Sequence, residues 1–185
     1  MNIFFLSHDT KECAAMHNDK HTTKMVLEYA QLLSTAHRVL DGVESVGLSK
    51  TGRKQKRYVL PDRREFAFYS ATHINHPSAI WVRKSRDNYV WLYQLLDSLC
   101  KEYTYRYGKI HKVEHSGLLD KLWFIPAGIP EHTKFTEPTP AMPDDVKVMG
   151  SSMESYRNYY RKNKSHLATW KGKFNSRPTP SWYTV

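Results

Sequence analysis

The sequence predicts a mainly α-helical, single-domain protein with about three long helices, a short N-terminal strand and irregular, proline-rich connections. Three observations support this fold class. Apolar residues recur at helical spacing over 9–40 and 77–108. The 185 residues fit one domain better than two. The 40% content of apolar residues excludes a wholly disordered chain. No apolar run approaches the length of a membrane span, so we expect no membrane partner.

The N-terminal residues 2–6, NIFFL, predict a short buried strand. The stretch MNIFFLSHD is too short for a signal peptide and has no basic n-region. We therefore expect it to be part of the folded structure.

A first long helix is predicted from Ser7 or Asp9 to about Leu40. Either side chain can cap the N-terminus by accepting a backbone N–H bond, and Gly42 suits a helix end. Its apolar stripe, at spacings of three, four and seven residues, comprises Met25, Leu32, Ala36 and Val39.

A Gly- and Lys-rich connection follows at 41–60 and predicts either a basic hairpin or a mobile flap. The next stretch, PDRREFAFYSATH, predicts only a weak short helix. Residues 77–108 predict the second long helix, because Pro77 suits its first turn and Gly108 its end.

The C-terminal third is less regular. LLDKLWFI predicts a short helix, and the proline-rich 125–150 predicts an extended wrap over the surface. A third helix is predicted to begin at Ser151 or Ser152, with Glu154 in its first turn. Residues 151–185 therefore form a basic, aromatic helix and tail.

Positive charge is concentrated in blocks, and the formal net charge is +10. The stretch 49–57 has five Lys or Arg and no acid, and from Ser155 onward there are seven Lys or Arg and no acid. Such blocks favour a polyanion partner, because each cation that contacts a phosphate releases a counterion. The alternative is the solvated surface of a basic protein. Aromatic residues within the blocks favour nucleic acid.

The two cysteines, Cys13 and Cys100, lack metal or redox spacing. We expect reduced thiols in a cytoplasmic protein, because no secretory signal is recognisable. We also expect no cofactor.

Polar side chains share one face of the first predicted helix. A carboxylate at the border of an apolar stripe, with a lysine one turn away, is typical of a general acid/base or an electrostatic stabiliser. The alternative is an ordinary surface ion pair beside scattered histidines. The row comprises His17, His21, Lys24, Glu28 and Gln31.

A metal site is the second alternative for this row. His17 and His21 are four residues apart and could share a metal with Asp9 or Glu28. Because HExxH and a third ligand at a recognised spacing are missing, we expect no metal.

The stretch before the second long helix is a candidate phosphate site. His73 and His76 precede the helix, and Arg83 and Arg86 lie on its early turns. Helix N-termini attract phosphate, and these side chains add charge-assisted donors. The alternative is that His76 and Pro77 merely begin the helix.

The third helix and the tail alternate aromatic and basic residues, as proteins that stack bases beside phosphate contacts do. The tyrosines could instead be the core stripe of this helix, and we expect a mixed role in which the tyrosines lie largely in the core and the cations contact DNA. The expected DNA contacts here are Arg157, Arg161, Lys164 and Trp170, and those on the first predicted helix are His17, Lys20 and Gln31.

These features together resemble the small phage-type pyrimidine-dimer DNA glycosylases/AP lyases, the endonuclease V-like family. The resemblance rests on the NIFFLS start, the helix with His17, Lys24 and Glu28, the HPSAIWVRKSRDNY helix, and the aromatic–basic end with PSWY. In general character the chain also resembles other phage proteins. The resemblance implies a compact, basic, helical enzyme whose first helix carries the catalytic glutamate, located in the host-cell cytoplasm.

That family attacks C1′ with the α-amine of a small residue exposed by removal of the initiator Met. Here Asn2 is bulky, so the resemblance implies the amine of Met1 instead. Lys24 or Lys20 could substitute if desolvated.

We therefore expect a DNA-acting enzyme that cleaves the glycosidic bond of a damaged or modified base. Glu28 would stabilise positive charge on the sugar or handle a proton, and His21 and Lys24 would position the substrate or attack it. The substrate would be duplex or single-stranded DNA, and a monomer is favoured. Two alternatives remain: a non-catalytic nucleic-acid-binding protein, and an enzyme acting on nucleotides or other phosphorylated small molecules.

Overall fold

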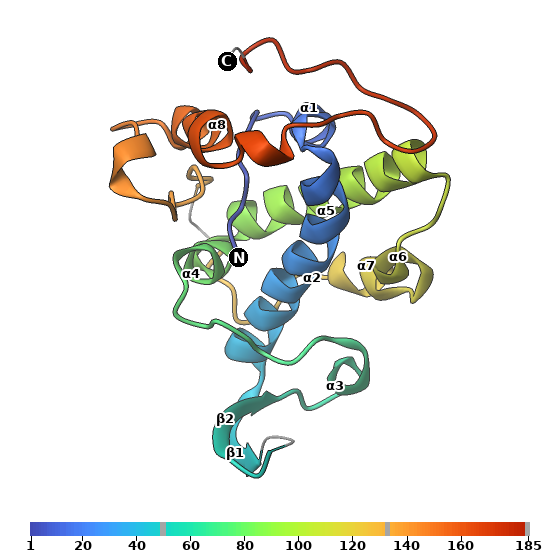
Figure 1. Ribbon diagram of the computed structural model, residues 1–185. Coiled ribbons are helices and arrows are strands. Elements are labelled where there is room, and N and C mark those ends of the chain that lie inside the picture. The colour runs from blue at the N-terminus through green and yellow to red at the C-terminus, as the bar shows by residue number, and fades with distance from the viewer. Residues whose placement is uncertain (49–50, 132–133, 184–185) are drawn as a thin grey trace.

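Two long helices, α2 (Asp19–Asp41) and α5 (Arg86–Tyr107), cross at the centre of the computed structural model, which describes residues 1–48, 51–131 and 134–183 (Figure 1). Helix α1 (Thr10–Met16) packs on α5, and α4 (Pro77–Lys84) packs on both long helices. The structure confirms that the chain is mainly α-helical, and the residues that it describes include one small two-stranded sheet.

Shorter helices surround this centre. They are α3 (Arg64–Ala67), α6 (Lys112–His115), α7 (Leu118–Leu122) and α8 (Ser152–Asn163), with 3₁₀ turns η1 (Asp144–Val146) and η2 (Ser165–Leu167). The segment 125–150, predicted as an extended wrap, has η1 as its one helical turn among the described residues.

The first predicted helix is in fact two helices. Asp9 caps α1 by accepting from the backbone of Lys11 and Glu12. His17 then adopts an extended conformation, and Asn18 caps α2 by accepting from the backbone N–H of His21. The prediction of one continuous helix was wrong because the break is capped by Asn18.

The second predicted helix is also broken, at Ser85. This residue is extended, with φ −151° and ψ 152°, and its side chain caps α5 by accepting from the backbone of Asn88. The Asn88 amide donates in turn to the carbonyl of Trp81 at 3.0 Å, which holds the two helices at the break. Gly108, at φ 63°, ends α5 as predicted.

Residues 3–6 are buried and Asn2 is half-buried, but the segment does not form the predicted strand. The backbone N–H of Phe4 donates to the hydroxyl of Tyr29 at 3.1 Å, and the carbonyl of Leu6 accepts from Arg157 at 2.9 Å. The segment is therefore held by side chains of α2 and α8 instead of by a neighbouring strand.

The basic connection at 41–60 forms the hairpin that was one of its two predicted forms. Strand β1 (Val43–Leu48) pairs antiparallel with β2 (Lys54–Val59), and Val43 lies opposite Val59. The hairpin projects from the helical body (Figure 1). Residues 49–50 of the predicted basic connection lie outside the described residues.

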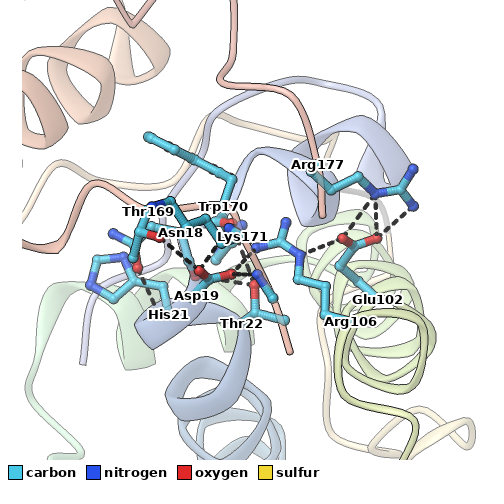
Figure 2. Close-up of polar contacts among 12 residues, drawn as sticks. Asn18, Asp19, His21, Thr22, Glu102, Arg106, Thr169, Trp170, Lys171 and Arg177 are labelled. Carbon is cyan, nitrogen blue, oxygen red and sulfur yellow. Dashed lines mark hydrogen bonds and ion pairs between the residues drawn. The ribbon is translucent and has the colours of Figure 1, made fainter. Parts of the chain in front are cut away.

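The buried guanidinium of Arg106 connects three parts of the chain (Figure 2). Its Nε donates to Glu102 at 2.6 Å, on the preceding turn of α5. Its Nη1 donates to the carbonyl of His17 at 2.9 Å and to Asp19 at 3.0 Å, and its Nη2 donates to the carbonyl of Ala15 at 2.7 Å. Arg106 thus fixes the junction of α1 and α2 against α5.

Asp19 extends this network to the C-terminal segment. Its carboxylate accepts from the Thr169 hydroxyl at 3.1 Å and from the backbone of Lys171 and Gly172 at 3.0 and 3.1 Å (Figure 2). Arg177 in the same segment pairs with Glu102 at 2.8 Å. The C-terminal segment is therefore anchored to the start of α2 and to α5.

None of the helices within the described ranges combines the length and the apolar character needed to cross a membrane.

Replacing Arg106 tests this network. Arg106→Met should lower the free energy of unfolding by about 3–5 kcal/mol, because it leaves the buried carboxylate of Glu102 and that of Asp19 without this partner. Urea denaturation followed by circular dichroism measures the change. The control is Lys101→Met, which removes an exposed pair with Asp97 on the same helix and should leave the midpoint unchanged. A near-wild-type midpoint for Arg106→Met would show that this network does not stabilise the fold.

Candidate active site on helix α2

On the polar face of α2, the carboxylate of Glu28 lies between two amines, one from Lys24 and one from Met1. Lys24 Nζ is 3.1 Å from Glu28 Oε1, and the backbone amino group of Met1 is 3.9 Å from Glu28 Oε2. The Glu28 side chain is only 14% exposed, whereas that of Lys24 is 69% exposed. The predicted Lys24–Glu28 pair therefore forms, and the second amine distinguishes it from an isolated surface pair.

His76 lies close enough to this site for the charges of Glu28 and of the Met1 amine to act on its ring. It caps α4, which packs against α2, and Figure 1 shows the N-terminus beside α4. Burial lowers the pKa of His76, and the charges of the Met1 amine and His73 lower it further, whereas Glu28 raises it. Its Nδ1 accepts from the backbone of Ser78 at 3.2 Å, so the neutral ring carries its proton on Nε2. This proton is available to a ligand at neutral pH.

His73 adopts a strained backbone conformation near His76. Its φ is +48°, which costs on the order of 1 kcal/mol in a residue with a side chain. The Thr72 hydroxyl lies 2.7 Å from His73 Nδ1, and the backbone N–H of Thr72 donates to Thr35 on α2 at 3.2 Å. Strain of this kind concentrates at functional sites. The loop thus presents an exposed histidine next to the polar row.

The structure divides the predicted row into a buried part and an open part. His17 is fully buried at the end of α1 and not on α2. Its Nδ1 donates to the carbonyl of Cys13 at 2.7 Å and its Nε2 accepts from Tyr29 at 2.9 Å. Burial lowers its pKa to about 4. The prediction that His17 contacts DNA does not agree with this position, because both ring nitrogens are already used.

His21 is buried as well and has a packing role. Its Nδ1 lies 2.6 Å from the Tyr160 hydroxyl, and its ring stacks on Phe4 at 4.1 Å. Burial lowers its pKa to about 2, with smaller contributions from His17 and Lys164. A ring held neutral in this way joins α2 to α8 and is not a proton donor at neutral pH, so the predicted catalytic role of His21 is not supported by its position.

The metal alternative finds no support in this arrangement. Within 1–48, 51–131 and 134–183, no three His, Cys, Asp or Glu side chains lie together in a way that could hold a metal ion.

The predicted DNA contacts of the C-terminal region are mostly occupied within the fold. Trp170 is 4% exposed, and its indole donates to the carbonyl of Met16 at 2.9 Å. Arg157 donates to Leu6 and to Glu154. Arg161 donates to the carbonyl of Trp182 at 2.7 Å and to Asn158. Burial therefore argues against base stacking on Trp170, whereas Arg157 and Arg161 hold α8 and the tail against the core and their contact with DNA stays a prediction.

The remaining predicted contacts lie in different places. Lys164 Nζ lies 5.0 Å from the centre of the Tyr159 ring, and Lys20 is exposed on α2. Gln31 continues the Glu28 face of α2 and is half-buried. Arg83 is half-buried, and its Nη1 has no hydrogen-bond partner among the described residues. Arg86 begins α5 and lines a separate cavity, so the predicted phosphate site at 73–86 is not one cluster.

Sequence reasoning missed the residues that hold this site in place. The side chains of Arg106 and Asp19 lie 87 positions apart in the chain, and Thr35 and Thr72 lie 37 apart. No spacing rule connects such pairs. The one available signal was the unusual Asn-Asp step at 18–19, which is typical of a helix start.

No protein-family model, curated protein or solved structure matches the chain, so the functional argument depends on this geometry.

The buried histidines predict loss of stability in acid. The pKa of His17 is about 4 in the folded state against 6.5 ordinarily, so the unfolded state binds more protons between these values. The contribution of His17 to the free energy of unfolding is therefore fully present above about pH 6.5. It should fall by about 1.4 kcal/mol per pH unit as the pH drops towards about 4. His37 should add to the fall, because its pKa is also about 4.

Urea denaturation at a series of pH values measures this slope. His17→Gln should flatten it, because glutamine takes up no proton, whereas His8→Gln, an exposed control, should follow the wild-type curve. A slope unchanged by His17→Gln would show that this buried ring does not govern acid stability.

Proposed function

We propose that the protein acts on a damaged or modified base in DNA and cleaves its glycosidic bond at Glu28. The observation that carries the proposal is the partly buried carboxylate of Glu28 between the amines of Met1 and Lys24, with His76 near enough to feel their charges. Such a reaction needs an amine and a carboxylate in one place, and a hydrogen-bond donor to the base assists it.

The chemistry follows from these positions. A neutral amine nitrogen attacks C1′ and forms a C–N bond, while the glycosidic bond breaks and the base leaves with the bonding electrons. The Nε2–H of the neutral His76 ring donates a hydrogen bond to the departing base, which takes its proton from water. Glu28 stabilises the positive charge that develops on the sugar and takes a proton from the attacking nitrogen. The C1′–O4′ bond then breaks, O4′ takes back the proton that Glu28 accepted, and the open-chain sugar remains as a protonated imine on the amine.

The charge of the molecule supports a DNA substrate. The formal net charge is +10, and the projecting hairpin carries Lys54, Lys56 and Arg57 on β2. Lys56 pairs with Glu44 and Arg57 donates to the carbonyl of Leu48, so the strands hold these cations in defined positions. With Lys20 and Lys24 exposed on α2, the cations can neutralise several phosphates. A base that reacts at Glu28 would have to leave the duplex stack.

The central prediction concerns Glu28→Gln. This change should leave DNA affinity within about threefold of wild type and lower base release by about 100-fold or more, because glutamine cannot stabilise the developing charge. Single-turnover assays on duplexes with deaminated, oxidised, alkylated, dimerised or 5-substituted bases measure release. Glu12→Gln, at the exposed start of α1, is the matched control.

Other outcomes would identify a different function. Steep loss of affinity with salt and no product from any duplex would indicate a non-catalytic DNA-binding protein. Binding of free nucleotides without a DNA footprint would indicate an enzyme on phosphorylated small molecules. Base release by Glu28→Gln at the wild-type rate would remove Glu28 from the mechanism.

A further inference from the structure

An open cavity of about 510 Å³ lies between the N-terminal half of α5 and the segment that follows α7. Its size is within the range of small-molecule sites, about 300–1,000 Å³. The lining includes Arg86, Val90, Tyr93, Gln94, Trp123 and Phe124. Of the side chains assigned above to the site around Glu28, none lines this cavity.

Two large aromatic side chains stand open to solvent at this cavity. Trp123 is 64% exposed and Phe124 is 69% exposed, although they are adjacent in the chain. The rings of Tyr93 and Trp123 are 5.4 Å apart at an angle of 70°. Burying these rings against a partner would be favourable, so adjacent exposed aromatics indicate a binding surface. Because the Tyr93 and Trp123 rings are set at this angle, they form a corner that a flat aromatic ring of a ligand can enter.

The charges around the cavity are unequal. Arg86 is exposed at the first position of α5, and no carboxylate pairs with its guanidinium among the described residues. Lys121 and Arg63 line a neighbouring hollow with Phe124. The charges of Asp97 and Asp120 act on Tyr93, but neither carboxylate lines the cavity. Among the described residues, the lining therefore contains the cation Arg86 and no carboxylate.

We propose that this cavity binds a nucleotide, with its base against Trp123 and Tyr93 and its phosphate on Arg86. Base stacking on aromatic rings tolerates any base, and a guanidinium forms two parallel hydrogen bonds to a phosphate. The Gln94 amide offers a donor and an acceptor to the edge of the base. The ligand is either a free nucleotide or an unpaired nucleotide in single-stranded DNA, since both present the same groups.

The site does not depend on the chemistry at Glu28. Glu28→Gln should bind nucleotide at this cavity as wild type does, and Trp123→Ala should still release a base at the Glu28 site from a short duplex. Failure of one proposal is therefore distinguishable from failure of the other.

Titrations with dAMP, deoxyadenosine and a single strand of about 12 nucleotides test the proposal, with isothermal calorimetry as the measurement. Trp123→Ala should weaken binding about tenfold or more. Arg86→Gln should weaken binding of dAMP but not that of deoxyadenosine, which lacks the phosphate. The aromatic control is Phe174→Ala, because the Phe174 side chain is 78% exposed and lies beside Gly108 at the far end of α5. Lys109→Gln is the matched charge control there.

Binding of dAMP would identify a free nucleotide as a ligand, and binding of the oligonucleotide alone would identify an unpaired base of a strand. The proposal is overturned if Trp123→Ala and Arg86→Gln bind as wild type, or if the wild type binds neither ligand. A dimer that Trp123→Ala disperses, with no nucleotide binding, would also overturn it, because the aromatic surface would then serve self-association.

Discussion

The buried guanidinium of Arg106 is the constraint on which the arrangement of the helices depends. A charge removed from water must be paired and fully hydrogen-bonded, or its desolvation costs several kcal/mol. Arg106 meets this requirement with the carboxylates of Glu102 and Asp19 and with backbone carbonyls at the end of α1. Those carbonyls are accessible because the chain is broken at His17. Arg106 therefore links the break at His17 to the orientation of α2. Through Asp19 and Glu102 it also links that break to the path of the C-terminal segment.

The same break determines which polar residues of α2 can act. With α2 beginning at Asp19, His21 turns towards Phe4 and Tyr160, and its burial keeps it neutral. Lys24 and Glu28, one and two turns later, lie where the Met1 amine and α4 meet. The same face of α2 is thus buried in the core at His21 and open to the site at Lys24 and Glu28. The arrangement gives Glu28 two amine neighbours while its own side chain stays mostly covered.

Local sequence signals predicted the elements but not their interruptions. Helical spacing indicated α2 and α5, and Gly108 marked the end of α5. The break at Ser85 depends on the Asn88 side chain, and that at His17 depends on contacts with Arg106, which spacing cannot reveal. The role of Trp170 was wrong for a related reason. Aromatic residues between cations form the same pattern whether they stack on bases or, as here, hold a tail to the core.

The most direct test of the Glu28 site is to trap its reaction intermediate. Borohydride reduces an imine between enzyme and sugar to a stable bond, and peptide mass mapping then identifies the attached residue, after intact mass has established which residue carries the free α-amine. We expect an adduct on the Met1 amine or on Lys24, the two amines beside Glu28. An adduct at a lysine distant from Glu28, or base release without any trapped adduct, would contradict it.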